Sequence, residues 1–572
     1  MQDNKNMVLF IVLSALILLG WSFLSDKVMP TAGPQTQKVQ NGKVVATPQP
    51  QASPAALPAT LQDRAAVLGA TPRLPIDTPA LKGSINLKGA RFDDLDLVTQ
   101  RETIAPNSPP VRLLSPAGAK GAYFAGFGWS GQGVAVPGPD TVWTASAPVL
   151  KPGAPVTLSW TNPTGQTFQL IVSVDDNYLF TVRQRVANAG PNAISVTPYG
   201  LVNRAEASPD KSMWTNHVGP VSYLGGKANY GVDWKDLDKD PAGTTTQSNG
   251  GWLGFSDKYW LTALAPAGNA PIAASVRKAA SGAYQADYSD APELIAPGQA
   301  VSTDAHLFAG AKDYDLLQKY EAQGIPQLNR AIDWGWFRFF MIPIFRLLLW
   351  LFHVTGNFGV AIICLTLIVR GAMFPIADKQ FKSMAAMRTI QPKMKAIQER
   401  YKDDKPRQQQ EILKLYQEEK VNPAAGCLPI LIQVPIFYAL YKVLMVSVEM
   451  RHQPFGLWIH DLSAPDPMTP VNLFGLLHFT PPAFLAIGVL PIIMGITMYM
   501  QFKLNPQQMD PIQQQMFSIM PWFLMVIMAP YAAGLLLYWC CSNILTLLQQ
   551  KWLYHRYGLT KTSDAQGAVP AK

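Results

Sequence analysis

Residues 357–377 read NFGVAIICLTLIVRGAMFPIA, an apolar run of 21 residues that carries one charged side chain, Arg370. A helix needs about 20 apolar residues to cross a bilayer, so this run is long enough. A span that ended at Val369 would have only 13 residues, too few to cross. Arg370 therefore lies within or near hydrocarbon, roughly 10 Å from the end of the span at Ala377.

Arg370 has three competing interpretations. An arginine in hydrocarbon costs about 2.5–3.5 kcal/mol on insertion scales, so its guanidinium must face protein or water. A structural ion pair needs an acid inside the membrane, and the other predicted core spans contain none. Snorkelling toward the cytoplasm can cover roughly 10 Å. The third interpretation is a hydrated pocket that receives polar or negative groups from a passing segment.

Four polar residues of the predicted spans are candidates for lining such a pocket. Thr366 lies four residues before Arg370, so the two share one face of a helix. The other candidates are Gln433, Ser542 and Asn543. Taken singly, each is more commonly a hydrogen-bonding residue between two helices than part of a cavity.

Further apolar runs follow the first at about 426–448, 484–499, 516–530 and 535–548. Residues 370–422 hold 12 Lys and Arg against 7 Asp and Glu, whereas 449–482 hold one Arg and three acids. Positively charged loops stay in the cytoplasm, so the first segment is predicted inside and the second outside. The last two runs have only about 15 residues, and short spans thin the bilayer around them.

The N-terminal part of the chain and the residues before Asn357 supply an anchor, a linker and an amphipathic helix. Residues 7–24 are apolar and are interpreted as a retained anchor, with a cleaved signal peptide as the alternative. The Pro-rich linker that follows cannot bury a core. Arg338, Arg346 and His353 fall on one side of a helix that also carries Trp, which indicates a helix in the membrane interface. The alternative is that this helix begins the next span.

From about 80 to 310 the pattern changes to short β-strands separated by Gly, Pro and Asn clusters. Residues 168–174 and 178–186 flank Asp175-Asp176-Asn177, which predicts a β-hairpin. About 230 residues of this pattern predict one antiparallel sandwich, closed by a helix at 311–323. Counting spans back from the cytoplasmic loop places the sandwich outside and both chain ends inside, which makes six spans.

The cytoplasmic segment 377–420 is predicted to be an α-hairpin, broken where Asp-Asp-Lys-Pro interrupts the helical pattern. Met and other apolar residues recur along its first arm at helical spacing. We interpret them as the seam of the hairpin; the alternative is an adaptable surface for apolar client segments, since Met repacks easily. The basic outer face includes Lys393, Lys395 and Arg400, which either contact the ribosome or only fix the orientation of the protein.

The composition excludes several other classes of protein. Of the 572 residues only 15% are charged, and the net charge is +9. All four cysteines lie in apolar stretches, which excludes a disulfide scaffold. Seven scattered histidines provide no zinc-site spacing, and Gly225-Gly226-Lys227 is followed by Ala228 rather than by the hydroxyl residue of a P-loop. The sequence therefore predicts no metal, no cofactor and no nucleotide hydrolysis.

Several linked motifs resemble one known family. They are IVRGAMFP at 368–375, VNPAAGCLP at 421–429, QVPIF at 433–437, LWIHDL at 457–462, and YW with SN at 538–543. In this order they resemble the YidC membrane protein insertases of the Gram-negative type, which are related to the Oxa and Alb insertases of mitochondria and chloroplasts. The resemblance covers essentially the whole chain.

The resemblance implies a six-helix membrane protein of the bacterial inner membrane that is not an enzyme. Five transmembrane α-helices would form a core with a hydrophilic groove, open to the cytoplasm and lipid, in which Arg370 attracts acidic client residues. The periplasmic all-β domain would be a β-supersandwich of the galactose-mutarotase type without mutarotase activity. The protein would insert and help fold nascent inner-membrane proteins, alone or with the Sec translocon and its accessory subunits, and would contact the ribosome weakly through its cytoplasmic loops.

The same resemblance assigns residues and segments. Phe437, Tyr538 and Trp539 would contact the client helix in the lipid bilayer. The motif residues that would shape the core are Gly371, Pro375, Cys427, Pro429, Pro435 and Pro521. The expected segments are the anchor 1–24, linker 25–79, sandwich 80–325, interfacial helix 333–355, insertase core 356–552 and cytoplasmic tail 553–572.

Two rival classes of function stay open. The first is a channel or small-solute transporter, against which stand a single intramembrane charge and the absence of repeated halves. The second is an anchored enzyme acting on envelope sugars, for which Glu206, Asp210 and Asp233 could supply an acid/base pair. Isolated surface carboxylates are far commoner than such pairs.

Overall fold

The computed structural model describes residues 61–210, 216–335, 337–402, 404–419, 428–474, 476–477, 486–504 and 511–556. Only the backbone is described at 379–389, 391, 405, 428–433, 511–514, 517 and 554. The predicted anchor 1–24, most of the linker, Cys427 and the last residues of the tail lie outside this part. The chain divides into two compact units, residues 1–333 and 334–572, each described here by itself.

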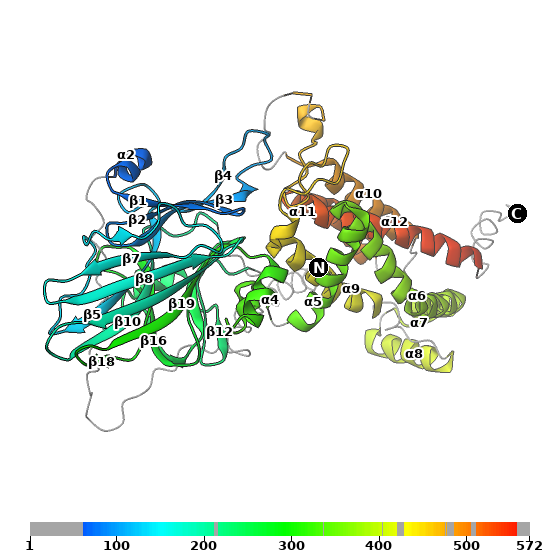
Figure 1. Ribbon diagram of the computed structural model, residues 1–572. Coiled ribbons are helices and arrows are strands. Elements are labelled where there is room, and N and C mark those ends of the chain that lie inside the picture. The colour runs from blue at the N-terminus through cyan, green and yellow to red at the C-terminus, as the bar shows by residue number, and fades with distance from the viewer. Residues whose placement is uncertain are drawn as a thin grey trace, which may run out of the picture. The chain divides into compact units, whose positions relative to one another are not determined.

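Unit 1 is an all-β sandwich whose two antiparallel sheets form the layers seen in Figure 1. One sheet has ten strands in the order β1-β2-β3-β5-β10-β17-β16-β13, with β4 paired to β3 and β18 paired to β10. The other has nine strands in the order β12-β11-β14-β15-β19-β9-β8-β7-β6. The fold thus agrees with the predicted antiparallel sandwich.

The strands of the ten-stranded sheet are β1 (Arg73–Asp77), β2 (Leu81–Asn86), β3 (Arg91–Arg101), β4 (Pro110–Leu114), β5 (Tyr123–Gln132), β10 (Ile194–Arg204), β13 (Thr244–Asn249), β16 (Pro271–Lys278), β17 (Tyr284–Ser289) and β18 (Glu293–Ile295). Those of the nine-stranded sheet are β6 (Thr144–Ala145), β7 (Val156–Thr161), β8 (Gln166–Val174), β9 (Leu179–Asn188), β11 (Gly219–Leu224), β12 (Lys227–Asn229), β14 (Trp252–Ser256), β15 (Trp260–Pro266) and β19 (Ala300–Ala311). Short helices α2 (Arg64–Gly69) and α3 (Trp234–Lys239) accompany them.

The core of the sandwich follows the two-residue period of its strands. Along β8, buried and half-buried side chains alternate from Gln166 to Val174. Phe168 packs edge-on against Trp129 of the other sheet, with ring centroids 5.3 Å apart. The predicted hairpin is confirmed, since β8 pairs with β9 antiparallel from Gln166 to Val174. Asp175 holds the turn, because its Oδ1 accepts the backbone N–H of Asn177 and Leu179 at 3.0 Å each.

The end of unit 1 packs firmly on the sandwich. Helix α4 (Tyr314–Ala322) and the 3-10 turn η1 (Leu328–Ala331) follow β19. Tyr314, Leu317 and Tyr320 of α4 are buried. The indole Nε1–H of Trp252 donates to the carbonyl of Pro326 at 3.1 Å. These contacts make residues up to Ile332 part of the sandwich.

Unit 2 is helical (Figure 1). Its helices are α5 (Arg338–Thr355), α6 (Phe358–Thr389), α7 (Gln391–Arg400), α8 (Lys405–Glu418), α9 (Leu428–Val446), α10 (Val489–Leu504), α11 (Pro511–Met528) and α12 (Ala533–Arg556), with 3-10 turns η3 (Val448–Met450) and η4 (Pro470–Asn472). Among the described residues, 338–355 and 358–378 are long and apolar enough to cross a bilayer. Shorter apolar stretches lie at 434–446, 489–504 and 518–528.

Several helices of unit 2 extend beyond the predicted runs. Helix α6 continues unbroken to Thr389, so the first arm of the expected hairpin is partly an extension of this helix. Residues 376–389 contain no Gly or Pro and are rich in Ala, Lys, Gln and Met, which favour helix. The helix ends before Pro392, which has no N–H to continue the ladder. Helices α11 and α12 have 18 and 24 residues, longer than the apolar runs of about 15.

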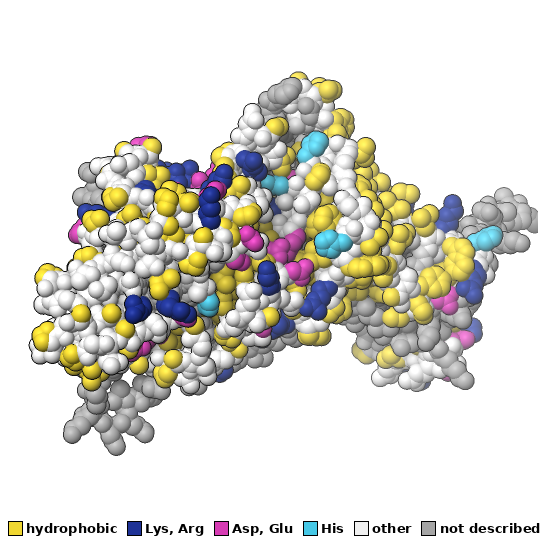
Figure 2. All heavy atoms as spheres, in the orientation of Figure 1, with side chains coloured by type: hydrophobic (Ala, Val, Ile, Leu, Met, Phe, Trp, Pro, Cys, Tyr) yellow, Lys and Arg dark blue, Asp and Glu magenta, His cyan; other side chains and the backbone are white. Residues whose placement is uncertain are grey.

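Hydrophobic side chains cover the outside of unit 2. On the face that Figure 2 shows, they form a broad, nearly continuous surface over the helices. The exposed apolar residues of these helices include Leu367, Ile368, Val434, Ile496, Met500, Ile519, Phe523, Val526, Ile544 and Leu548. A soluble protein rarely leaves so many large apolar side chains uncovered, so this surface fits contact with lipid.

Candidate functional site

Arg370 lies on the buried face of α6, after a series of apolar side chains on the same face. Phe358, Ile362 and Leu365 are buried at the spacing of one helix face, and Leu367 and Ile368 on the other side are exposed. Asn357 begins the helix, since its Oδ1 accepts the N–H of Val360 at 3.1 Å. Thr366 is on the buried face and is 0% exposed. Arg370 follows one turn later and is half-buried.

Arg370 is held by a single side chain of α12. Its Nε donates to the hydroxyl oxygen of Ser542 at 3.1 Å, and its Nη2 donates to the same oxygen. Within the described part of the chain no carboxylate pairs with this guanidinium. A guanidinium has five N–H donors, so one hydroxyl leaves most of its hydrogen-bonding capacity available. The charge is therefore positioned but not neutralised by the described residues.

The backbone beside Arg370 is also irregular. Pro375 lies inside α6 and has no N–H, so the carbonyl of Gly371 has no donor four residues later. A side-chain carbon at Gly371 would meet no atom within 4 Å, so space is open next to this residue. A cation with spare donors and a carbonyl without its helical partner lie next to each other in the chain. The guanidinium can donate hydrogen bonds to a polar group of another molecule, and the carbonyl can accept one from it.

The other predicted pocket residues have different partners. The Thr366 hydroxyl donates to the Ile362 carbonyl of its own helix at 2.6 Å. The Asn543 Nδ2 donates to Thr497 of α10 at 3.1 Å, which is the helix–helix alternative considered from the sequence. The backbone of Gln433 is in α9, but its side chain is outside the described set. The structure thus brings together Arg370 and Ser542 only. Thr497 was missed, although it is a polar residue inside an apolar run like the others.

Lys442 corrects the expectation of a single intramembrane charge. It is in α9, four residues before the helix ends, and its residue exposure is 1%. Lys442 lies near the end of an apolar run, where lysines commonly extend to the surface, so the sequence alone gives no sign of its burial. In the structure it is buried among the helices of unit 2. The charge count therefore no longer weighs against a transporter.

The aromatic residues expected at the client helix differ in exposure. Phe437 of α9 and Trp539 of α12 are half-buried and meet edge to face, with centroids 4.6 Å apart. Tyr538 is only 1% exposed and packs inside unit 2. A client helix would reach the Phe437–Trp539 pair without repacking the core, whereas Tyr538 would first have to be uncovered.

One segment, residues 453–468, ties together the N-terminal ends of α6, α10 and α12; we call it the clasp. Asn357 Nδ2 donates to the Phe455 carbonyl at 2.9 Å. The N–H groups of Ala533 and Gly534 donate to the carbonyls of Ala464 and Leu462 at 2.7 and 2.9 Å. The clasp therefore fixes the spacing of three helices at one end of the unit.

Asp466 is the charged centre of the clasp. It is 5% exposed, and its carboxylate accepts the Trp458 indole N–H at 2.9 Å, the Met468 N–H at 3.0 Å and the Leu490 N–H at 2.7 Å. The last bond places a negative charge at the N-terminus of α10, where the helix dipole favours it. A Cβ at Gly488 would lie 2.6 Å from that of Asp466, so glycine permits this approach. Asp466 lies four residues after the LWIHDL motif and was not among the predicted site residues.

The cytoplasmic helices show which of the predicted basic residues are already paired. Lys393 donates to Glu419 at 2.6 Å, and this hydrogen bond raises the pKa of the lysine above its ordinary value. Lys395 and Arg400 are exposed and have no ion pair with a described residue. Met394 is buried in the seam, where the Tyr416 hydroxyl donates to its sulfur at 3.3 Å. For Met394 the seam interpretation is confirmed.

Two of the three carboxylates considered for an acid/base pair in the sandwich, Asp210 and Asp233, serve local structure. Asp233 caps α3, accepting the N–H of Trp234 at 2.7 Å, in a capping box with Asp236. Asp210 accepts the N–H of Lys258 at 2.9 Å. Each therefore has a backbone partner of its own, and the structure brings neither to a catalytic partner among the described residues.

Sequence similarity to named proteins identifies the family. A membrane protein insertase YidC of Zymomonas mobilis subsp. mobilis is 49% identical over 563 residues, which cover 97% of this chain and 96% of the relative. This chain belongs to the YidC family of membrane protein insertases. The YidC insertase of Methylorubrum extorquens is 42% identical over 591 residues, covering 98% of this chain and 96% of that protein. Residues 73–347 match the YidC periplasmic domain family and residues 350–560 the 60Kd inner membrane protein family.

Solved structures are more distant. An active YidC insertase with its first transmembrane domain resolved is 19% identical, covers 83% of this chain and 91% of its own, and has a TM-score of 0.36. A galactose mutarotase related enzyme of Lactobacillus acidophilus is 8% identical over 42% of this chain and 97% of its own, with a TM-score of 0.28. Both TM-scores are below 0.5, so family membership rests on the sequence relatives. By that membership the protein is an inner-membrane protein with a periplasmic domain.

Proposed function

We propose that this insertase moves polar flanks of nascent inner-membrane proteins past a hydrated site centred on Arg370. The observation that carries the proposal is the guanidinium of Arg370, which is half-buried on the inner face of an apolar helix and bonded to Ser542. A polar segment in hydrocarbon loses its water, and a prepositioned cation with spare donors offsets part of that cost for acidic residues. Gln433, Thr366 and Asn543 are proposed to border the same groove.

The hydrophobic part of the client follows a different path in this proposal. The exposed apolar face that includes Val434 and Ile544 gives the client helix a hydrophobic surface that faces lipid. Phe437 and Trp539 lie along the same two helices and offer rings on which a client helix packs. Pro435 and Pro521 interrupt the backbone ladders of α9 and α11, and Pro375 that of α6. Pro429 ends the preceding motif at 421–429, and all four prolines are proposed to shape the groove.

The proposed topology has six spans with both termini in the cytoplasm. It combines the anchor 7–24 with five core helices, α6 and α9 to α12, and leaves α5 in the membrane interface. The positive cytoplasmic segment and the acidic clasp region support this orientation. Partners in this proposal are nascent membrane proteins, the Sec translocon and, through the cytoplasmic loops, the ribosome. No covalent step and no cofactor enter the mechanism.

The function is tested by depleting the protein from cells and measuring which inner-membrane proteins still insert. An insertase predicts that many unrelated membrane proteins fail together, those with polar external segments most of all. A channel or transporter predicts loss of one solute flux with normal insertion. A sugar enzyme predicts altered envelope glycans with normal insertion.

Deleting the sandwich is expected to leave basic insertion intact. The deletion should span residues 61–332 and keep the chain from Asp333, because α4 and Ile325 to Ile332 bury their apolar side chains against the strands. The reason is that the proposed site lies entirely in unit 2. Insertion of a small client into vesicles measures the effect, and membrane content of the truncated protein is the control. Complete loss of insertion by a truncated protein that is still present would refute the expectation.

Reversing the unpaired basic residues of the hairpin is expected to weaken binding of ribosome–nascent-chain complexes. Lys395→Glu with Arg400→Glu removes two exposed cations that could contact phosphates, and such contacts are strongly salt-dependent. Cosedimentation with ribosomes measures binding, and added salt should mimic the loss in the wild type. Lys393→Glu is a separate arm, because it also breaks the pair with Glu419. If the double variant is correctly oriented and binds ribosome–nascent-chain complexes as the wild type does, these charges only set the orientation of the protein.

A further inference from the structure

Sheet edges expose unpaired backbone groups, and folded proteins normally protect them. Among the described strands of unit 1, five of the edge strands are protected. Strand β1 contains Pro75 and is partly covered by Leu150, which bridges to Ile76. Strand β4 contains Pro110 and Arg112 and pairs irregularly with β3. Strands β6, β12 and β18 have only two or three residues each.

Strand β13 is the exception. It has six residues, Thr-Thr-Thr-Gln-Ser-Asn, with no charge and no proline, and it pairs with β16 in unbroken register. Thr245, Thr246 and Gln247 are all exposed, so both faces of the strand meet solvent at its middle. The strand also ends the ten-stranded sheet. Among the residues that the structure describes, none of the usual devices that protect an edge is present at β13.

The register shows which backbone groups point outward. Asn249 pairs with Pro271, which has no N–H, so this pair cannot exchange hydrogen bonds. Pairs alternate along an antiparallel ladder, so Thr245, Gln247 and Asn249 direct their N–H and C=O groups away from β16. No described residue bonds to these outward groups of Thr245 and Gln247. They form a short row of free donors and acceptors.

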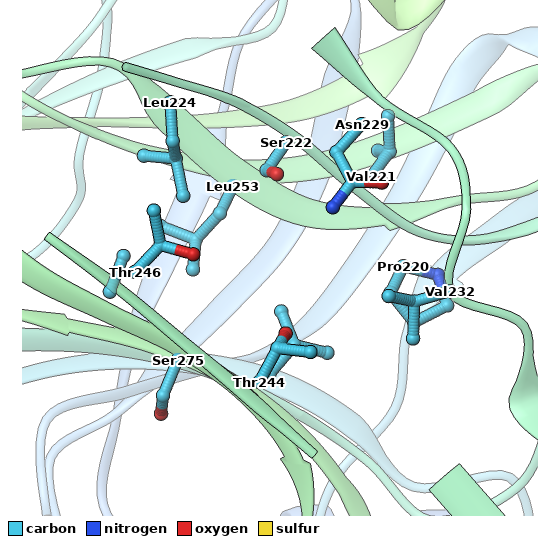
Figure 3. A pocket seen from close by; sticks show the side chains of 12 residues that line it. Pro220, Val221, Ser222, Leu224, Asn229, Val232, Thr244, Thr246, Leu253 and Ser275 are labelled. Carbon is cyan, nitrogen blue, oxygen red and sulfur yellow. The ribbon is translucent and has the colours of Figure 1, made fainter. Parts of the chain in front are cut away.

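A pocket lies between the two sheets, lined by β13 and by its paired neighbour β16. Figure 3 shows Thr244 and Thr246 of β13 facing Ser222 and Leu253 of the other sheet across it. Its volume is about 20 Å³, enough for the tip of a small side chain. Ser248, near the C-terminal end of β13, ties this strand to the other sheet, since its hydroxyl oxygen accepts the N–H of Gly225 at 2.9 Å. Alternate side chains of an added strand would point to the same side of the sheet as Thr244 and Thr246, and the rest would point away.

We infer that β13 receives an extended segment of a client protein as an added β-strand, bonded through the outward N–H and C=O groups at Thr245 and Gln247. The inference rests on the proposed function, because an insertase delivers translocated client segments as extended chain. Backbone pairing does not depend on side-chain identity, which suits clients of many sequences. The protein's own linker has six prolines at 30–58, which cannot donate, and its proline-free stretch 35–47 is the competing occupant that the exchange experiment below would reveal.

The test uses the full-length protein in nanodiscs and a short, dye-labelled peptide of alternating Thr and Val. The same peptide with an N-methyl group on every amide nitrogen has the same side chains but donates no backbone hydrogen bond from either edge. Fluorescence anisotropy should show binding of the first peptide and not of the second. Gln247→Pro removes an outward N–H and is tolerated at an edge, so it should weaken binding about three- to tenfold, the worth of about one hydrogen bond. Gln247→Ala keeps that N–H and is the matched comparison.

A second arm separates this inference from the proposed function. Insertion is measured for one client with a long external segment and one with a short segment. Gln247→Pro should lower the ratio of long-segment to short-segment insertion below that of the wild type. If the wild type inserts neither client, the insertase function itself is refuted. If Gln247→Pro has the wild-type ratio, only the inference that β13 receives a client strand is refuted.

Three further results would overturn the inference. Equal binding of the methylated and unmethylated peptides would show that backbone pairing is not involved. Slow hydrogen exchange at Thr245 and Gln247 in the protein alone would show that its own chain already covers the edge. A change from dimer to monomer on sedimentation of Gln247→Pro would show that the edge pairs with a second copy. Unchanged thermal unfolding of the variant verifies that its sandwich is folded.

Discussion

Arg370→Ala is expected to reduce insertion of clients with acidic translocated segments by about tenfold or more. A hydrogen bond to a charged group is worth about 1.5–3 kcal/mol, and each 1.4 kcal/mol is about a factor of ten. Clients with neutral segments should lose much less, because they gain little from the charge. Arg370→Lys should keep much of the function, since a point charge suffices to attract a carboxylate. The measurement is the rate of insertion into vesicles for a matched pair of clients that differ only in acidic residues.

The control for this experiment is another arginine of unit 2. Arg338→Ala removes the same charge from the start of α5, where the arginine makes no hydrogen bond to Ser542, and should not distinguish acidic from neutral clients. Ser542→Ala removes the residue that positions the guanidinium while leaving its charge, so it should have a smaller effect than Arg370→Ala. Equal losses for acidic and neutral clients in Arg370→Ala would reject the electrostatic role. The arginine would then serve only the packing of α6 against α12.

Local signals in the sequence predicted the parts of the fold that local chemistry controls. The β8–β9 hairpin was predicted from Asp175 to Asn177, and Asp175 indeed bonds the turn. Strand β3 gave no such signal, because Asp93 and Asp94 are poor strand residues. They are buried there because Arg73 pairs with Asp93 and Arg64 with Asp94, 20 and 30 residues away. Pairings of this kind depend on the folded sheet and cannot be seen in a local window.

For the candidate site too, the sequence predicted some features and could not predict others. That Arg370 needs a polar partner follows from its place in an apolar run, and Ser542 was among the residues named. The sequence could not show that these two meet, because they are 172 residues apart. It also could not separate Ser542 from its neighbour Asn543, since a helix turns about 100° between them and directs one to α6 and the other to α10. Lys442 and Asp466 were missed because burial at a helix end depends on the surrounding elements.

Asp466→Ala is expected to lower the free energy of unfolding of the protein by several kcal/mol. The substitution leaves the N–H groups of Trp458, Met468 and Leu490 without their acceptor, and each unsatisfied buried group costs about 1–3 kcal/mol. Domain stabilities are about 5–15 kcal/mol, so the loss is a large share. Asp466→Asn keeps one acceptor oxygen and should have an intermediate effect. Thermal unfolding followed by tryptophan fluorescence measures the change.

Asp461→Ala is the matched control, because Asp461 is in the same clasp but hydrogen-bonds only Ser463 of its own turn and otherwise lies 3.9 Å from His452 Nε2. A second readout follows from Leu490, whose N–H meets Asp466 and whose carbonyl accepts the Cys540 thiol at 3.4 Å. In a protein whose other three cysteines are serine, Cys540 should resist maleimide in the wild type and in Asp461→Ala. It should react in Asp466→Ala, because α10 and α12 separate once the clasp opens. If Asp466→Ala unfolds at the wild-type temperature and keeps Cys540 protected, the carboxylate does not hold these helices together.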